Sequence, residues 1–196
     1  HMDSSLQQQL QQWYQQWQQE DANHSDRLQR WRNIEPESAA LLALWVRSKR
    51  AQKVLEIGTS NGHSTIWLAD AVRATGGHVT SLEIEAARTA LAQQHLQQVG
   101  LAEQVSLHTI DAAEFLSQAQ ADYDVVLLDA ERSFYVGYWP DLRRLLTGKT
   151  GALLVVDNVL SHAEQVADFI ALVQADASMC SHTVSSGAGL FCVTAA

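Results

Sequence analysis

The chain has 196 residues, of which 46% are hydrophobic, and a formal net charge of −9 at pH 7. This length suits one domain with a sizeable core, and the acidic balance disfavours a nucleic-acid surface, because phosphate recognition needs clustered Lys and Arg. Without an apolar run of the roughly 18 residues that span a bilayer, or a start like a signal peptide, we expect a cytoplasmic protein that binds neither nucleic acid nor membrane.

Residues 1–32 predict a helical extension ahead of a domain that spans residues 33–196, and His1-Met2 resembles the remnant of a cleaved tag. Glutamines dominate the extension, but an apolar stripe recurs at helical spacing. The stripe consists of Leu6, Leu10, Trp13, Tyr14 and Trp17. Its regularity favours an amphipathic helix over a prion-like tract. It must be buried either on its own domain or on a partner subunit, and because aromatic residues are enriched at interfaces we expect a homodimer.

The next helix is predicted from Pro36 to Arg50, since proline suits a first helical turn. Beyond it, apolar strands alternate with helices, which is typical of a parallel sheet with helices on both faces. The predicted strands are 54–57, 78–82, 105–110, 125–128 and 152–156, and the predicted helices are 64–73, 86–99, 112–119, 138–146 and 162–173. Two last strands, 182–184 and 190–193, predict an antiparallel hairpin. The fold class is therefore a doubly wound α/β fold with a mostly parallel seven-stranded sheet.

The first predicted strand runs through Glu56 into a turn that contains Gly58, Ser60 and Gly62 and leads to a helix near Ser64. Glycines allow a ligand to approach the backbone, and a helix start offers free N–H donors. A tight turn without a ligand is the structural alternative. The dinucleotide fingerprint is incomplete, because Ser60 stands between the two glycines.

Acidic residues follow the next two strands. Glu83 lies where an acid of a doubly wound fold accepts bonds from ribose hydroxyls. Asp111 lies where a carboxylate can accept a bond from an adenine amino group. An isolated acid at a strand end is usually only solvated. Here, however, a glycine turn and two acids follow three successive strands, and this succession favours a nucleoside pocket.

Specific segments resemble the class I S-adenosylmethionine-dependent methyltransferases, in particular the catechol and caffeoyl-CoA O-methyltransferase group with its bacterial relatives. The resemblance covers roughly residue 33 to the C-terminus and predicts a Rossmann-like methyltransferase fold. The segments are Val54-Leu55-Glu56-Ile57-Gly58-Thr59 with Gly62, Leu128-Asp129-Ala130, and Val155-Val156-Asp157-Asn158.

The resemblance implies S-adenosylmethionine as cofactor. The family's first loop holds the methionine moiety, which here implies Glu56, Gly58, Ser60, Gly62 and Ser64. The ribose acid falls on Glu83, and the adenine contacts fall near Ile84, Asp111 and Ala112. Asn33-Ile34 resembles the segment that closes over the cofactor, and Asp129 lies beside it.

Asp129 ends one buried strand, and Asp157 and Asn158 end the next. If the strands are neighbours, three oxygen ligands converge about 5 Å apart, a set that suits Mg²⁺ and tolerates Ca²⁺ or Mn²⁺. Helix capping by these residues is the alternative. The resemblance favours the metal, because all three metal ligands of the family have counterparts here.

Arg132 stands where this family usually carries a lysine, three residues after the first metal aspartate. Arginine stays protonated and cannot act as a base, but it can stabilise a phenolate or hold an acidic substrate group. We therefore expect Asp129 and Arg132 to serve catalysis. Glu131, or the metal alone, could remove the need for the lysine.

Together these features predict a metal-assisted O-methyltransferase that acts on a hydroxyl of a small, catechol-like molecule. A metal-independent methyltransferase is the first alternative. A cofactor-binding homologue without turnover is the second, and a nucleotide-dependent dehydrogenase is a more distant third.

Overall fold

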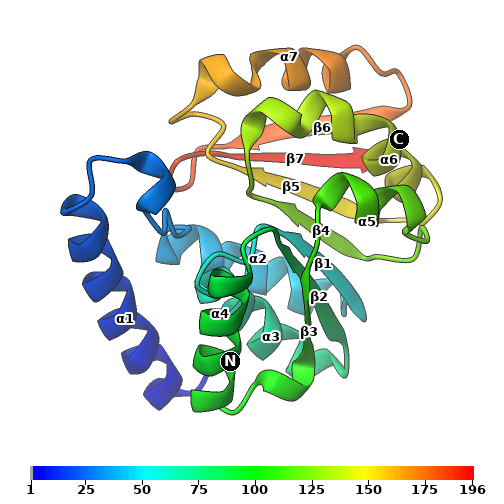
Figure 1. The fold of residues 1–196 in the computed structure, drawn as a ribbon. Helices are drawn as coiled ribbons and strands as arrows, with labels where there is room; N and C mark the ends of the chain where they lie inside the picture. The colour runs from blue at the N-terminus through cyan, green and yellow to red at the C-terminus, as the bar shows by residue number, and fades with distance from the viewer. Residues whose placement is uncertain (1) are drawn as a thin grey trace.

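The computed structural model describes residues 2–196 and has one sheet of seven strands in the order β3-β2-β1-β4-β5-β7-β6 (Figure 1). The strands are β1 (Lys53–Ile57), β2 (His78–Glu83), β3 (Val105–Thr109), β4 (Val125–Leu128), β5 (Leu153–Asp157), β6 (Met179–Val184) and β7 (Leu190–Ala195). The first five pair in parallel, and β7 pairs antiparallel with both β5 and β6. The predicted fold class is confirmed.

Helices cover both faces of the sheet (Figure 1). They are α1 (Ser4–Ala22), α2 (Pro36–Ser48), α3 (His63–Thr75), α4 (Ala86–Gln98), α5 (Ala112–Gln118), α6 (Tyr135–Thr147) and α7 (Ala163–Gln174), with 3₁₀ turns η1 (Arg27–Gln29), η2 (Ala102–Gln104) and η3 (Arg132–Phe134). One core cluster joins the sheet to the first four helices and another joins it to the last three. Along β4, Val125 and Leu127 belong to the first cluster, and Val126 and Leu128 to the second. A central strand buried on both faces is therefore apolar throughout, as predicted.

The N-terminal stripe is buried on the protein's own domain. Trp13 and Trp17 are 9% and 4% exposed, and both rings pack against His95 of α4, with centroid distances of 4.8 and 5.1 Å. The ring centre of Tyr14 lies 5.3 Å from that of His63 of α3. The stripe thus needs no partner subunit, and the homodimer stays a prediction without this support. Met2, from the suggested tag remnant, is buried in the same cluster, while His1 lies outside the described residues.

Two elements begin three residues earlier than predicted. α6 begins at Tyr135 instead of 138, because its aromatic first turn is buried. β6 begins at Met179 instead of 182, and most of its first residues are exposed. Among residues 2–196, no helix has the length and apolar character needed to cross a membrane.

The C-terminal ends of β1 and β4 approach each other at Gly58. This residue has φ of 108°, and a Cβ atom placed on it would lie 1.9 Å from the carbonyl oxygen of Asp129. The Gly58 and Thr59 N–H groups both donate to the Leu82 carbonyl, at 2.9 and 3.1 Å. A side chain at position 58 would therefore separate the ends of three strands.

We predict that Gly58→Ala destabilises the protein far more than Gly76→Ala. Both glycines have positive φ, but a Cβ at Gly76 meets nothing within 4 Å. Gly76→Ala should cost about 1 kcal/mol of backbone strain, and Gly58→Ala should lose a further ~1–3 kcal/mol through overpacking. Urea unfolding measures both values, and equal losses would contradict the steric role of Gly58.

Candidate active site

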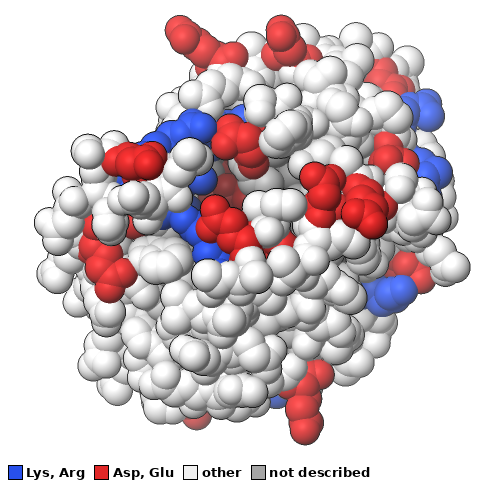
Figure 2. All heavy atoms as spheres, viewed as in Figure 1, with Lys and Arg blue, Asp and Glu red and all other residues white. Residues whose placement is uncertain are grey.

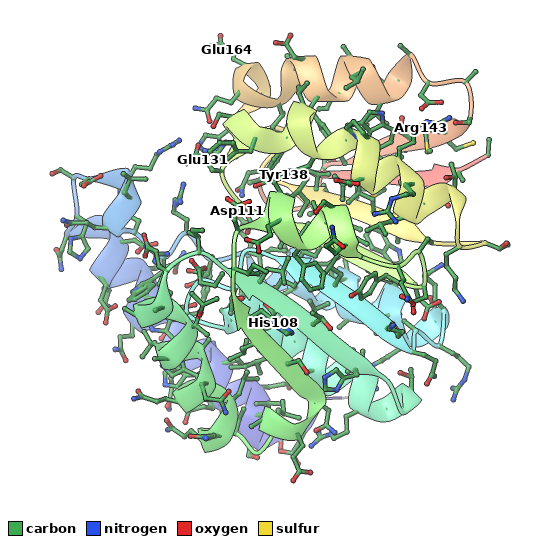
Figure 3. All side chains as sticks on the ribbon, turned by 45° about the vertical axis from the view of Figure 1, so that its right-hand side comes forward. His108, Asp111, Glu131, Tyr138, Arg143 and Glu164 are labelled. Carbon is green, nitrogen blue, oxygen red and sulfur yellow. The ribbon has the colours of Figure 1, made fainter. Side chains whose placement is uncertain are left out.

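A cavity of about 260 Å³ lies at the C-terminal ends of the parallel strands. Figure 3 shows Asp111, Glu131 and Tyr138 at this edge of the sheet. Most of the predicted cofactor residues line the cavity: Ile34, Gly58, Ser60, Ser64, Glu83, Ile84, Asp111, Ala112 and Asp129. Arg132 and Asn158 line it as well. Glu56, Gly62 and Asp157 do not line it, and they take positions behind its wall.

Glu83 joins the first loop to the second strand. Its Oε1 accepts a hydrogen bond from the Ser60 N–H at 2.8 Å, and its Oε2 accepts one from the Glu85 N–H at 3.0 Å. The side chain faces the cavity, and each carboxylate oxygen can accept a further bond. Glu83 therefore fixes the turn and still offers acceptors to a ligand's hydroxyl groups.

Glu56 supports the loop from inside the protein. Its carboxyl group is fully buried and accepts hydrogen bonds from Ser64 Oγ at 2.5 Å, from Ser81 Oγ at 2.7 Å and from Thr65 Oγ1. Burial raises its pKa to about 7, although the three hydroxyl groups favour the ionised form. Gly62 similarly serves packing, because a Cβ there would lie 3.1 Å from the Cβ of Ala92 in α4.

The residues predicted to contact adenine are Ile84, Asp111 and Ala112, and they line the cavity beyond the ends of β2 and β3. Asp111 caps α5, because its Oδ1 accepts hydrogen bonds from the Ala113 N–H at 2.8 Å and the Glu114 N–H at 3.3 Å. Capping is one of the structural roles open to such an acid, and it does not remove Asp111 from the cavity. Ile84 is 65% exposed at the mouth, as a residue that packs on a planar ligand would be.

A segment from the N-terminal part of the chain covers the cavity. We call residues 27–35 the strap, and Leu28, Trp31, Arg32, Asn33 and Ile34 within it line the cavity. At the α1 end, Asp21 accepts hydrogen bonds from the N–H groups of Trp31 at 2.7 Å and Arg32 at 2.9 Å. These hydrogen bonds therefore connect the N-terminal extension to the wall of the cavity.

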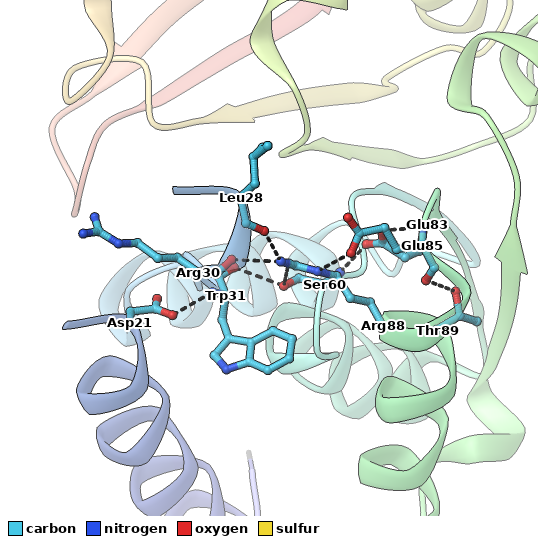
Figure 4. A network of polar contacts seen from close by, with 9 residues as sticks. All are labelled: Asp21, Leu28, Arg30, Trp31, Ser60, Glu83, Glu85, Arg88 and Thr89. Atoms are coloured by element: carbon cyan, nitrogen blue, oxygen red, sulfur yellow. Dashed lines mark hydrogen bonds and ion pairs between the residues drawn. The ribbon is translucent and has the colours of Figure 1, made fainter. Parts of the chain in front are cut away.

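Arg88 of α4 fastens the strap to the first loop (Figure 4). Its guanidinium donates to the carbonyls of Leu28 at 2.9 Å and Arg30 at 3.1 Å, and to Ser60 Oγ at 3.1 Å. It also lies 5.1 Å from the ring centre of Trp31. Sequence reasoning missed Arg88, since an arginine three residues after Glu85 is typical of an ordinary surface ion pair.

The two strand-end aspartates face each other across neighbouring strands. Leu128 of β4 pairs with Val156 of β5, so Asp129 lies beside Asp157. Asn158 Nδ2 donates to Asp129 Oδ1 at 3.0 Å. Burial raises the pKa of both aspartates; for Asp157 the neighbouring Asp129 carboxylate raises it further, while Arg32 and Arg132 oppose the shift of Asp129.

The chemistry of this group fits a hard cation. Asp157 is 1% exposed, and neither of its carboxylate oxygens has a hydrogen-bond partner within residues 2–196. Buried carboxylate oxygens without partners are costly, and a cation is one way to satisfy them. The set has two carboxylates and one amide, and residues 2–196 contain no group of three His, Cys, Asp or Glu side chains arranged for a metal.

Arginines lie close to the same acids. Arg132 is 5% exposed, and its Nε donates to Gln165 Oε1 at 2.6 Å. Arg32 of the strap gives the largest charge effect on the pKa of Asp129, and the sequence analysis did not identify it. Arg27 forms an ion pair with Glu131 at 3.2 Å. This pairing makes Glu131 a poor candidate for a free general base.

The aromatic residues after Arg132 divide between core and cavity. Tyr135 and Trp139 are buried in the core, and the Tyr135 hydroxyl accepts from the Ala130 N–H at 2.8 Å. Tyr138 lines the cavity, as does Phe134, which is 57% exposed. His162 also lines the cavity.

Known proteins share this architecture. A catechol O-methyltransferase of Niastella koreensis is 33% identical over 132 residues, which cover 65% of this chain and 58% of that protein. A catechol O-methyltransferase of Mycobacterium tuberculosis is 35% identical over 130 residues, which cover 65% and 57%. The matched region is thus less than two thirds of either relative.

Among solved structures, an O-methyltransferase from Bacillus cereus in complex with SAH superposes with a TM-score of 0.79 over 100% of this chain and 92% of that one. At 22% identity this likeness shows a shared fold. The model of the O-methyltransferase family matches residues 6–179, which include most of α1, the strap and every strand-end residue of the cavity. The chain therefore belongs to the O-methyltransferase family.

Proposed function

We propose that the protein transfers a methyl group from S-adenosylmethionine to a hydroxyl oxygen of a small, catechol-like molecule, with the assistance of a divalent cation. The observation that carries this proposal is one cavity that joins the Glu83 loop to the Asp129–Asn158 edge. A nucleoside site and an acidic site thus share one space. Family membership and the SAH-bound neighbour support the choice of cofactor.

In this proposal the cofactor lies along the ends of β1, β2 and β3. Glu83 accepts hydrogen bonds from the ribose hydroxyl groups. The adenine contacts Ile84, Asp111 and Ala112, and the loop from Gly58 to Ser64 holds the methionine part. Glu56 positions the Ser64 hydroxyl. The strap residue Ile34 would cover the ligand, and Asp129 would lie beside its reactive end.

The acceptor hydroxyl lies at the edge formed by Asp129, Asp157 and Asn158. These three residues would hold Mg²⁺, or alternatively Ca²⁺ or Mn²⁺, and a bound cation favours the ionised form of a hydroxyl group. The hydroxyl proton would leave to solvent, S-adenosylmethionine would supply the methyl group to the oxygen, and S-adenosylhomocysteine would be the other product. Arg132 stabilises negative charge in this step, and the cavity holds the reactants in line.

A metal-independent methyltransferase is the second candidate, and one observation favours it. Arg32 and Arg132 both act on Asp129, so positive charge is present beside the acids without a cation. In that case the two guanidiniums alone would favour the ionised acceptor. A cofactor-binding homologue without turnover would keep the Glu83 loop and lose only the chemistry at the acidic edge.

We predict that Glu83→Ala weakens the binding of S-adenosylmethionine by about 1–2 kcal/mol, the scale of lost charge-assisted hydrogen bonds. Calorimetry measures the affinity, and Glu114→Ala, an exposed acid of α5, is the control. Because Glu83 also accepts two backbone bonds, thermal unfolding without ligand must show that the variant is folded. Equal affinity in a folded variant would remove Glu83 from the cofactor site.

We predict that Arg88→Ala loosens the strap. The variant loses bonds to two strap carbonyls and to Ser60, each worth about 1 kcal/mol before water replaces them. S-adenosylhomocysteine should dissociate roughly tenfold faster, and proteases should cleave within the strap sooner. Arg73→Ala is the control, since Arg73 is half exposed, pairs with Asp70 and does not line the cavity. Identical dissociation rates in the two variants would show that Arg88 has no part in closure.

We predict that chelation with EDTA abolishes turnover and that added Mg²⁺ restores it. Asp157→Asn should abolish metal-dependent turnover and the calorimetric signal for Mg²⁺, while Glu164→Gln, an exposed acid, should resemble the wild type. Without a cation, Asp157→Asn should also melt at a higher temperature, because the neutral amide removes carboxylate repulsion. Undiminished turnover of the wild type in EDTA would decide for the metal-independent candidate.

A further inference from the structure

Two guanidinium groups at the cavity have no carboxylate partner. Arg132 is 5% exposed, and its Nη2 atom is buried and has no hydrogen-bond partner within residues 2–196. Arg32 lines the same cavity, and neither arginine belongs to an ion pair in the described part of the chain. A buried guanidinium nitrogen without a partner is unfavourable, so Arg132 is suited to bind an anion that enters the cavity.

The Asp129 charge acts on Arg32, so the surroundings of these arginines would be cationic only with a divalent cation to offset Asp129 and Asp157. Arg27 lies nearby, but Glu131 neutralises it at 3.2 Å. Burial lowers the pKa of His162, and the charges of Arg132, Arg27 and Arg32 lower it further. Figure 2 shows basic side chains gathered inside a hollow of this face, with acidic side chains along its border.

The same part of the cavity has an apolar wall. Phe134 and Leu28 are 57% and 61% exposed although both are large and apolar, and both line the cavity. The ring of Phe134 lies 6.3 Å from that of Tyr138. Exposed aromatic and aliphatic groups beside a few polar groups are typical of a ligand site, and here they suit a planar ring.

We propose that the methyl acceptor is an aromatic hydroxy acid, whose carboxylate binds Arg132 and Arg32 while its ring packs against Phe134 and Leu28. This inference rests on the proposed function. A divalent cation would offset the charges of Asp129 and Asp157, and the sulfonium of the cofactor adds a further positive charge. A neutral catechol would then leave both arginines uncompensated, whereas a carboxylate can bind a guanidinium through two parallel hydrogen bonds.

The test compares 3,4-dihydroxybenzoate with its methyl ester, which has the same ring and hydroxyl groups. The ester group withdraws electrons more strongly than the carboxylate, so hydroxyl acidity alone favours the ester. Two ratios between the acid and the ester are measured: the ratio of kcat/KM, and the ratio of affinities for the S-adenosylhomocysteine complex in the presence of Mg²⁺. The second ratio does not depend on turnover.

We expect the wild type to prefer the acid at least tenfold in both ratios. Arg132→Met should reduce this preference about tenfold, the scale of a lost charge-assisted contact, and Arg132→Lys should retain part of it. Arg73→Met should keep the wild-type ratios. If Arg132→Met misfolds, Arg132→Lys and Arg32→Met test the same contact.

A wild-type ratio near one, or variants of Arg132 and Arg32 that keep the wild-type preference, would overturn the inference. Failure of the proposed function looks different, because neither compound would then be methylated by the cofactor-loaded protein. In that case the affinity ratio in Mg²⁺ still decides whether the cavity recognises the carboxylate.

Discussion

The contact between Gly58 and the Asp129 backbone determines how the ligand-facing residues are arranged. A Cβ at position 58 would lie 1.9 Å from the Asp129 carbonyl oxygen, so β1 and β4 can approach at their ends only with glycine there. At this point the helix after β1 packs on one face of the sheet and the helix after β4 packs on the other. Open α/β sheets bind ligands where the connections diverge in this way. The cavity therefore follows from a backbone constraint before any polar side chain is considered.

Two buried acids at this edge illustrate different solutions to the same electrostatic problem. Glu56 and Asp157 are both almost fully buried, and burial raises the pKa of each. Three hydroxyl groups donate to Glu56, so hydrogen bonds within the protein offset the free-energy cost of burying its carboxylate. Asp157 has no such donors, and a second carboxylate lies beside it. Glu56 therefore serves as a structural support, whereas the buried Asp157 carboxylate still requires a positive charge nearby.

Much of this arrangement could be predicted from local sequence, because strand ends on a parallel sheet meet at one edge. Gly58, Glu83, Asp111 and Asp129 were placed by that rule alone, and all four line the cavity. Arg88 and Arg32 could not be found in this way, since their roles depend on tertiary contacts between segments far apart in the chain. The start of β6 at Met179 was missed for a related reason: an exposed edge strand lacks the alternating pattern that identifies strands.

The strap also changes how the N-terminal extension is understood. Its apolar stripe does not require a second subunit, because Trp13 and Trp17 pack on α4, the helix that carries Arg88. Asp21 at the end of α1 and Arg88 on α4 then hold the strap from opposite sides. Burial of the stripe thus fixes the position from which the strap reaches across the cavity. The glutamine-rich helix consequently helps to position the wall of the cavity, although none of its residues lines it.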